Sequence, residues 1–320
     1  MSNISIAPMM GYTDKHFRVL ARFLSADILL YTQMIVADAL AYNSSVTSAF
    51  GSDNRLGNVV LQLGGSNIKS LVVAGKVAKN FGYREINLNI GCPSSKVKLG
   101  GIGVCLLKTP EVVAECVDAL SQIGGLRVTV KTRIGVDDIG GFDYLCDFVR
   151  KVRAAGCAGV IFHARKAWLN GLSPKDNRNV PPLDYGVVKD LRSEFADYYI
   201  GINGGIVDYR QGMDFVGDFS EVMLGRHGYK NLQLVLRLVN QNEKYISMSG
   251  FLEKYLSYAL SVNCPINNVL RHCMGLYYAG HYSGRWRRAV SLAMQDSSEI
   301  NLNKMFELAV EIDRFYQSQV

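Results

Sequence analysis

Eight short segments of β-forming residues recur before residue 230, and amphipathic helical stretches separate them. Most of these segments are continuous apolar runs, as expected for parallel strands buried on both faces. Regular alternation of strand and helix predicts a parallel sheet, and eight such units close a (β/α)8 TIM barrel, a fold of about 250 residues. The expected strands are 4–10, 29–35, 59–64, 85–91, 128–134, 159–165, 199–205 and 221–226, with helices such as 68–81, 110–123 and 144–155.

The alternative for the same pattern is a doubly wound open sheet. That fold usually has fewer strands and an early Gly-x-Gly-x-x-Gly turn, which this sequence lacks. After residue 240 the pattern changes to four helical stretches with no strand between them, at 251–260, 266–279, 285–294 and 302–316. The sequence therefore predicts an α/β barrel over residues 1–240, followed by a small all-α domain over residues 241–320.

The composition is that of an ordinary soluble globular protein, with 48% hydrophobic and 20% charged residues in a chain of 320. No apolar run approaches the roughly 18 residues of a membrane helix. The first residues lack the basic and apolar regions of a signal peptide. We therefore expect a cytoplasmic protein without membrane contact, and a monomer, since nothing indicates a protein partner. The net charge of +7 permits a polyanionic partner but does not identify one.

The seven cysteines are irregularly spaced and form no Cys-x-x-Cys pair or Cys/His cluster, so no metal site is expected. Six of them mostly lie among apolar residues, where a cysteine is usually a small buried hydrophobe. Cys92 differs because it follows a short apolar strand and lies between Gly91 and Pro93. Active sites of (β/α)8 barrels lie at the C-terminal ends of the strands. Cys92 is therefore the candidate for the reacting group.

Glycines and an arginine follow the last two expected strands, as Asn203-Gly204-Gly205 and Gly225-Arg226. In (β/α)8 enzymes these two turns often bind phosphate, because glycines let backbone N–H groups approach it and an arginine adds charge. Either glycine turn could instead serve only to reverse the chain. Both turns together with Arg226 favour a phosphate site.

Other strand ends carry residues with two interpretations each. Lys131 lies in a run that should be buried, so it needs either an anionic ligand or a carboxylate partner at the barrel mouth. His163 could be a core histidine, but its place at a strand end favours a ligand contact. Gln62 could close the barrel or present its amide to a flat ring. Met9 and Met10 could be core or form a polarisable surface under a ring.

Seven motifs, in order along the barrel, resemble those of the tRNA-dihydrouridine synthases. They are Ala-Pro-Met-Met at 7–10, Gln-Leu-Gly-Gly at 62–65, Asn-Leu-Asn-Ile-Gly-Cys-Pro-Ser at 87–94, Val-Lys-Thr-Arg at 130–133, His-Ala-Arg-Lys-Ala at 163–167, Asn-Gly-Gly-Ile at 203–206 and Leu-Gly-Arg at 224–226. Gly-Leu-Ser-Pro-Lys-Asp-Asn-Arg at 171–178, Val-Pro-Pro-Leu at 180–183 and Trp-Arg-Arg at 286–288 resemble the branch that acts on position 20 or 20a of the D-loop. Where the family often has Gly-Ala-Cys-Leu, this chain has Gly-Val-Cys-Leu at 103–106, and we interpret Cys105 as structural.

The resemblance implies an FMN enzyme that reduces a uridine of tRNA to 5,6-dihydrouridine, with NADPH as the reductant of the flavin. On the family pattern, Cys92 is the proton donor. The residues that would bind the flavin are Pro8, Met9, Met10, Gln62, Lys131, His163, Asn203, Gly204, Gly205, Gly225 and Arg226. Those that would contact tRNA are Asn89, Lys175, Arg178 and Arg287.

The proposed chemistry explains why a thiol would serve as an acid. The C5=C6 bond of uracil is conjugated with the C4 carbonyl group, so hydride adds at C6 and a proton must reach C5. The hydride comes from the reduced flavin, while the protein positions the rings and supplies the acid. A thiol with a pKa near about 8.5 is mostly protonated at pH 7 and can donate its proton.

Two other functions fit part of the sequence. A flavin barrel that acts on a small pyrimidine such as dihydroorotate would share the flavin residues but would not need a basic helical tail. A non-catalytic tRNA-binding or chaperone protein could retain FMN. The segment 271–288 has four arginines, interleaved aromatic residues and no acidic residue, which favours tRNA. A solvated basic helix would have the same composition.

Overall fold

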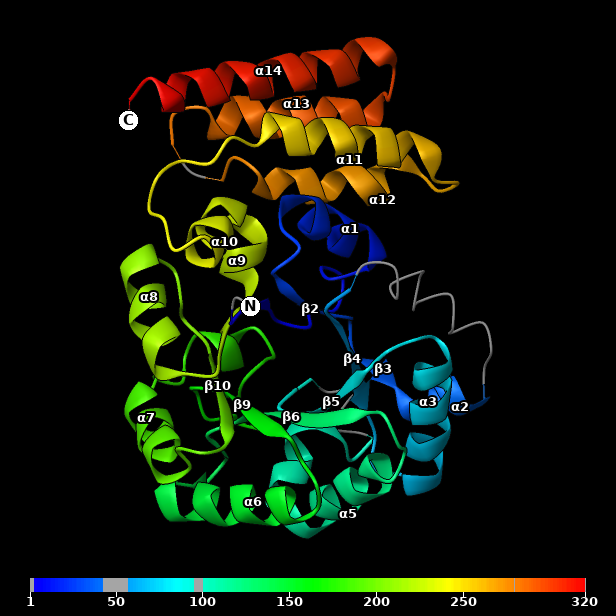
Figure 1. Ribbon diagram of the computed structural model, residues 1–320, viewed down its shortest axis with the longest axis vertical. Coiled ribbons are helices and arrows are strands. Elements are labelled where there is room, and N and C mark those ends of the chain that lie inside the picture. Colours follow the sequence, from blue (N-terminus) through cyan, green and yellow to red (C-terminus); the bar gives the residue numbers. More distant parts are fainter. Residues whose placement is uncertain (1–2, 43–56, 95–99, 279, 320) are drawn as a thin grey trace.

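Eight parallel strands form a closed barrel in the computed structural model, which describes residues 3–42, 57–94, 100–278 and 280–319 (Figure 1). The strands follow one another in the order β2-β1-β11-β10-β9-β6-β5-β4, and a further pairing of β2 with β4 closes the ring. The (β/α)8 barrel is therefore confirmed, and the open, doubly wound sheet is wrong. The barrel strands are β1 (Ile4–Ile6), β2 (Leu29–Tyr31), β4 (Val59–Gly64), β5 (Glu85–Ile90), β6 (Arg127–Arg133), β9 (Gly159–His163), β10 (Tyr199–Asn203) and β11 (Glu221–Leu224).

The strands begin close to where the sequence predicts them, but most end earlier. The first expected strand, 4–10, stops at Ile6, because Pro8 has no N–H group to donate to a ladder. β10 stops before Gly204, whose φ of 111° turns the chain out of the sheet. The residues beyond each strand end therefore form the loops at the barrel mouth. Three short strands lie outside the eight, namely β3 (Ile35–Val36), which pairs with β4, and the hairpin of β7 (Gly135–Val136) with β8 (Ile139–Gly140).

Helices alternate with the strands and cover the outside of the barrel (Figure 1). Capping residues set the N-termini of several of them: the side chains of Asn67, Asp184 and Asp208 accept hydrogen bonds from the first turns of α3, α7 and α8. The barrel helices are α1 (Lys15–Leu24), α2 (Ala37–Tyr42), α3 (Ile68–Asn80), α5 (Pro110–Ser121), α6 (Phe142–Ala154), α7 (Tyr185–Glu194), α8 (Tyr209–Asp218), α9 (Arg226–Lys230) and α10 (Leu232–Val239), with short 3-10 turns η3 (Gly103–Lys108) and η4 (Asp176–Arg178).

The interior of the barrel is partly apolar and partly polar. Ala7, Tyr31, Val60, Ile161 and Met223 form a small buried apolar cluster. Polar side chains are also fully buried there, including Gln62, Asn87 and Thr129 on the neighbouring strands β4, β5 and β6. Such barrels are usually filled by branched apolar side chains. Buried polar groups need partners, so this part of the interior must satisfy its hydrogen bonds internally.

The C-terminal helices lie together at one end of the molecule, over α1 (Figure 1). They are α11 (Ser249–Ser261), α12 (Ile266–Leu270), the 3-10 turn η5 (Arg271–Gly275), α13 (Ser283–Gln295) and α14 (Glu299–Gln317). The single helix expected over 266–279 is instead two short pieces, and its last residue, Ala279, lies outside the described residues. A division of the chain into domains at residue 240 stays a prediction.

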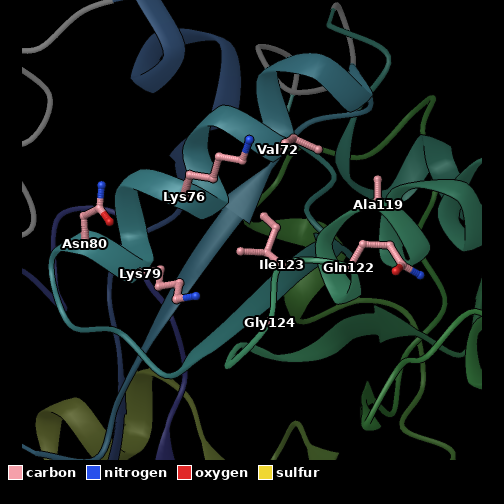
Figure 2. Close-up of a pocket in the computed structure, with 8 residues that line it drawn as sticks. All are labelled: Val72, Lys76, Lys79, Asn80, Ala119, Gln122, Ile123 and Gly124. Carbon is pink, nitrogen blue, oxygen red and sulfur yellow. The ribbon is translucent and has the colours of Figure 1, made fainter.

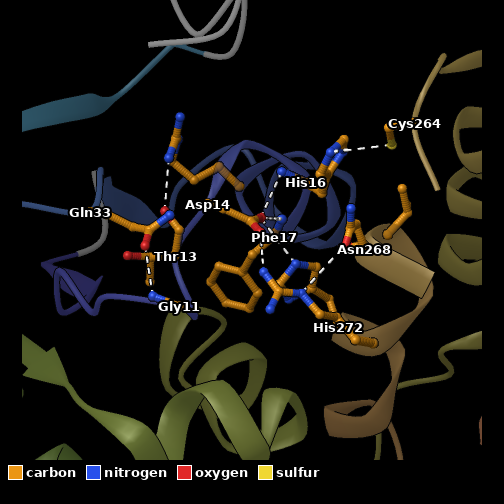
Figure 3. A network of polar contacts seen from close by, with 12 residues as sticks. Gly11, Thr13, Asp14, His16, Phe17, Gln33, Cys264, Asn268 and His272 are labelled. Carbon is orange, nitrogen blue, oxygen red and sulfur yellow. Dashed lines mark hydrogen bonds and ion pairs between the residues drawn. The ribbon is translucent and has the colours of Figure 1, made fainter. Parts of the chain in front are cut away.

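A polar network joins the barrel to these helices (Figure 3). Asp14 caps α1 by accepting from the backbone N–H groups of His16 and Phe17, and it also pairs with Arg271 and, at 3.0 Å, with His272 Nε2. Burial alone would raise the pKa of Asp14, but the bonds from His272, Phe17 and Arg271 hold it well below its usual value. One carboxylate therefore both starts α1 and holds η5.

Candidate active site at the mouth of the barrel

The strand register gathers polar side chains from the four strands β5, β6, β9 and β10 at the C-terminal end of the barrel. Asn89 is paired in register with Lys131, and His163 with Asn203. Lys131 Nζ donates a hydrogen bond of 3.0 Å to Asn203 Oδ1, and Asn203 Nδ2 donates to the Met223 carbonyl group at 2.6 Å. In the described part of the chain, the hydrogen-bond partner of Lys131 is thus an amide rather than a carboxylate. The predicted flavin residues of β6, β9 and β10 lie together.

Cys92 lies half-buried in a turn that is fixed on three sides. Asn89 Oδ1 accepts hydrogen bonds from the N–H groups of Gly91 (3.1 Å) and Cys92 (2.9 Å). The Cys92 carbonyl group accepts from Val104 N at 3.1 Å. The Gly91 carbonyl group accepts from Arg133 Nε at 3.0 Å. Because neighbouring groups hold its backbone on both sides, the Cα atom of Cys92 has a fixed position at the mouth of the barrel.

Arg133 connects the Cys92 turn to the loop that follows β9. Besides Gly91, its guanidinium group donates to the carbonyl groups of Lys166 (3.0 Å) and Asn177 (2.9 Å). The Asn177 side chain in turn bonds to both backbone groups of Trp168, at 2.7 and 2.8 Å. Arg133 and Asn177 each lie in a motif of the sequence, but neither motif predicts this structural role. A polar residue inside a loop motif carries no signal that it will be buried.

Positive charge is concentrated around Cys92. Burial lowers the pKa of Lys131 to about 8 and that of Arg133 to about 10, and each cation also lowers the pKa of its neighbours. Burial lowers the pKa of His163 well below its usual value, and Arg133 and Lys131 lower it further. Cys92 is close enough to Lys131, Arg133 and Arg178 to interact electrostatically with each. The site can therefore attract an anion and present a neutral imidazole.

The turns after β10 and β11 contain the expected glycines. Gly204 and Gly205 have φ values of 111° and 68°, and a side chain at Gly204 would collide with His163. The turn and its packing therefore require glycine at both positions, whether or not a phosphate binds. A Cβ atom on Gly225 would instead meet open space. Arg226 follows it and donates to Asn179 Oδ1 at 3.0 Å, which brings this turn beside the loop after β9.

The other predicted flavin residues differ in exposure. Met10 is 64% exposed at the mouth, whereas Pro8 is half-buried and Met9 packs against the core. Gln62 is fully buried and bonds to side chains on β5: its Nε2 donates to Asn87 at 2.8 Å, and its Oε1 accepts from Asn89 at 2.9 Å. Gln62 thus has a structural partner on each side of its amide.

The residues predicted to contact tRNA lie in three different settings. Lys175 is exposed and Arg178 half-buried on the loop after β9, and the buried Nε atom of Arg178 has no hydrogen-bond partner among the described residues. Arg287 is exposed on α13. The side chain of Asn89 points toward Gln62 and its own turn, as described above. Trp286, which the sequence groups with the basic segment, is buried and donates from Nε1 to the Cys273 carbonyl group at 2.9 Å.

A groove of about 640 Å³ lies on the outer wall of the barrel, away from the mouth. Its lining comes from α3, including Lys76 and Lys79, and from the end of α5 with residues 122–124 that follow it (Figure 2). This end of the barrel is opposite the C-terminal ends of the strands. Across the described residues, no three or more His, Cys, Asp or Glu side chains are grouped to hold a metal ion, and no helix has the length and apolar character of a membrane span.

The sequence is similar to known proteins over almost its whole length. A profile of the family described as dihydrouridine synthase (Dus) matches residues 5–310. The tRNA-dihydrouridine(20/20a) synthase of Shewanella oneidensis is 39% identical over 317 residues, which are 97% of this chain and 94% of that protein. The proteins of the same name from Pasteurella multocida and Escherichia coli K12 are 40% and 38% identical, over 90% of this chain and 89% and 85% of theirs.

Two solved structures resemble the fold. The crystal structure of TcOYE with pHBA has a TM-score of 0.53 and 10% sequence identity, over 77% of this chain and 90% of that one. Morphinone reductase has a TM-score of 0.51 and 12% identity, over 78% and 88%. At these identities the likeness concerns the fold alone.

Proposed function

The chain belongs to the dihydrouridine synthase family, and from this premise we propose that it reduces a uridine of tRNA to 5,6-dihydrouridine at position 20 or 20a of the D-loop. The support is the match over 94% of the length of a relative named for that reaction. The observation in the structure that carries the proposal is the placement of Cys92. Its backbone is fixed at the end of β5, and Lys131, Arg133 and Arg178 are close enough to interact with it electrostatically.

We propose FMN as the cofactor, and the residues at the mouth fit it. Lys131 is a half-buried cation with an amide as partner, and an anionic ring would stabilise it. The open side of Gly225 and the neighbouring Arg226 suit a phosphate group. The exposed Met10 offers an apolar surface beside them. In this arrangement Lys131 and His163 would contact the ring, and Asn203, Gly204, Gly205, Gly225 and Arg226 would hold the phosphate. Gln62, which is fully buried and bonded at both ends of its amide, would support Asn89 rather than touch the ring.

When bound, the reduced flavin supplies a hydride to C6 of the uracil, and NADPH is the reductant we propose for it. The Cys92 thiol supplies the proton that C5 needs, and it regains a proton from water after each turnover. Arg133 holds the Cys92 turn through the Gly91 carbonyl group, so the backbone that carries the thiol would stay in place when the base binds. Lys131 places positive charge where the ring system becomes electron-rich.

The uracil must leave its stack to reach Cys92, which costs a few kcal/mol for a stacked base and less in a loop. RNA enzymes offset such a cost through contacts to phosphates and to the shape of the RNA. Lys175 and Arg178 lie on the loop that Arg133 ties to the Cys92 turn, and Arg287 is exposed on α13. These features support tRNA as the substrate rather than a small pyrimidine such as dihydroorotate. A tRNA substrate also agrees with the expected cytoplasmic location.

The decisive experiment is site-resolved mapping of dihydrouridine in tRNA from cells that lack this protein. We expect the modification at position 20, 20a or both to disappear and to return when the gene is restored. The purified protein should be yellow, with flavin absorbance. Unchanged dihydrouridine at both positions would refute the proposed substrate, and a colourless, inactive protein that FMN does not reactivate would refute the cofactor.

A further inference from the structure

A continuous chain of side-chain hydrogen bonds crosses the barrel interior from the Cys92 turn to the opposite end of the strands. It starts at the N–H groups of Gly91 and Cys92, which donate to Asn89 Oδ1. The remaining bonds run from Asn89 Nδ2 to Gln62 Oε1 (2.9 Å), from Gln62 Nε2 to Asn87 Oδ1 (2.8 Å), from Asn87 Nδ2 to Thr129 Oγ1 (3.0 Å) and from Thr129 Oγ1 to Glu85 Oε1 (2.8 Å).

One end of this chain of hydrogen bonds can only donate, and the other end can only accept. The backbone N–H groups of Gly91 and Cys92 can only donate. The carboxylate of Glu85, paired with Arg127 at 2.5 Å, can only accept. The Thr129 hydroxyl must therefore donate to Glu85, and its oxygen is left to accept from Asn87. Each amide in between then has one orientation that satisfies both of its neighbours.

The location of the chain makes a break in it costly. Gln62, Asn87 and Thr129 are fully buried, so a group that loses its partner has no water to replace it. If Thr129 no longer accepted a hydrogen bond, the Asn87 amide would be free to turn over. After that rotation the Asn87 NH2 group would face the Gln62 NH2 group, and neither could accept from the other. If Gln62 rotated in response, its NH2 group would in turn face that of Asn89. The effect would reach the two N–H groups that hold the Cys92 turn.

We propose that Glu85, Thr129 and Asn87 are positioning residues for the reaction: through this chain they fix the Asn89 amide and thereby the backbone of Cys92. The inference rests on the proposed function, because the geometry it protects is that of the Cys92 thiol against the base. None of the three residues needs to touch the cofactor or the substrate. Glu85 and Arg127 lie at the start of β5 and β6, the end of the barrel opposite the mouth.

Three variants test the proposal. Thr129→Val removes the hydroxyl group with almost no change in shape, and Thr129→Ser retains it. Ser5→Ala is the matched control, because Ser5 on β1 is equally buried and its hydroxyl also donates to a carboxylate, that of Glu221, which is not part of this chain of hydrogen bonds. The first readout is hydrogen–deuterium exchange at the N–H groups of Gly91 and Cys92, which requires no activity. The second is kcat and KM for tRNA in the FMN-loaded enzyme.

Thr129→Val should speed exchange at both N–H groups by about tenfold. It should lower kcat by roughly ten- to a hundredfold with little change in the KM for tRNA, because the turn is displaced but the RNA surface is not. Thr129→Ser should restore both quantities, and Ser5→Ala should leave both near wild type. If Thr129→Val and Ser5→Ala exchange alike at Gly91 and Cys92, the proposal is wrong. If the valine variant does not fold, Glu85→Gln takes its place, since a glutamine can donate and thus removes the acceptor-only end.

The two readouts separate this proposal from the proposed function. A wild-type enzyme that forms no dihydrouridine overturns the function and, with it, the catalytic role of these residues. An active wild-type enzyme whose Thr129→Val variant keeps its kcat and its slow exchange overturns the positioning role alone.

Discussion

Lys131 Nζ and Asn203 Oδ1 lie 3.0 Å apart across the mouth of the barrel, and the amide oxygen is a neutral partner for a buried cation. Burial, and secondarily the charge of Arg133, lowers the pKa of Lys131 to about 8. A site built in this way holds an ammonium group that lacks a full counter-charge. An anionic ligand would supply that charge.

The shifted pKa of Lys131 predicts a pH dependence of stability. Between pH about 8 and 10.5 the unfolded chain binds more protons at this residue than the folded protein does, so the free energy of unfolding should rise with pH. The contribution is at most about 3 kcal/mol, since water reaches the mouth. Denaturant titrations at several pH values in this range measure the free energy of unfolding. It should rise more steeply with pH for the wild type than for Lys131→Met. Parallel pH curves would contradict the shift. Bound FMN should reduce the difference, because it stabilises the charged form.

Glu221 should have the opposite pH dependence. Burial raises its pKa to about 7, although Ser5, Tyr31 and Tyr199 donate hydrogen bonds to its carboxyl group. The folded protein then binds more protons than the unfolded chain between pH 4.5 and 7, so this residue's contribution to stability falls as pH rises through that range. Relative to Glu221→Gln, the wild type should lose up to roughly 3 kcal/mol from pH 4.5 to 7 and then level off. A constant difference would be the contrary result.

Lys175 and Arg178 should act on tRNA binding rather than on the chemical step. Alanine at either position should raise the KM for tRNA. It should also reduce the slope of log KM against log salt concentration by about 1, as expected for the loss of one phosphate contact. The control is Lys76→Ala, which removes an exposed lysine from the groove on the outer wall (Figure 2). Steady-state kinetics over a range of salt concentrations measures both quantities. If all variants have equal KM values, Lys175 and Arg178 do not contribute to tRNA binding.

Asp14 should stabilise the contact between α1 and the C-terminal helices. Asp14→Asn keeps a good helix cap but removes the charge that faces Arg271 and His272. It should lower the free energy of unfolding by about 1–2 kcal/mol, and Asp14→Ala should cost about 1 kcal/mol more because the cap is lost too. Calorimetry compares the three proteins. If asparagine and alanine prove equally harmful, the ion pair matters and the cap does not; if asparagine is as stable as the wild type, the ion pair contributes nothing.

The sequence predicted the barrel strands and the position of Cys92, because both follow from the order of residues along a strand. Continuous apolar runs located the barrel strands, and a cysteine between glycine and proline marked the end of β5. The helix expected over 266–279 was wrong because of a tertiary contact: η5 packs so closely on α9 that a Cβ atom on Gly275 would lie 2.4 Å from the Tyr229 carbonyl oxygen. Helical periodicity cannot indicate such an approach.

The interior hydrogen bonds could not be predicted from the sequence. Gln62, Asn87 and Thr129 look like isolated polar residues in three separate apolar runs, and only the strand register places each beside the next. In the same way, Trp286 looks like a stacking residue beside arginines, but its indole ring fills the core of the C-terminal helices. Aromatic residues between arginines serve RNA binding and helix packing equally well, and burial decides between the two.

The most direct test of the central claim is the rate of dihydrouridine formation by Cys92→Ala, with Cys105→Ala as the matched control on η3. We expect Cys92→Ala to bind FMN and tRNA as the wild type does, while its rate falls by at least about a hundredfold because the acid is lost. Cys105→Ala should be nearly silent. Unchanged turnover in Cys92→Ala would contradict the assignment of Cys92 as the proton donor, and a large loss in Cys105→Ala alone would assign the acid to the other thiol.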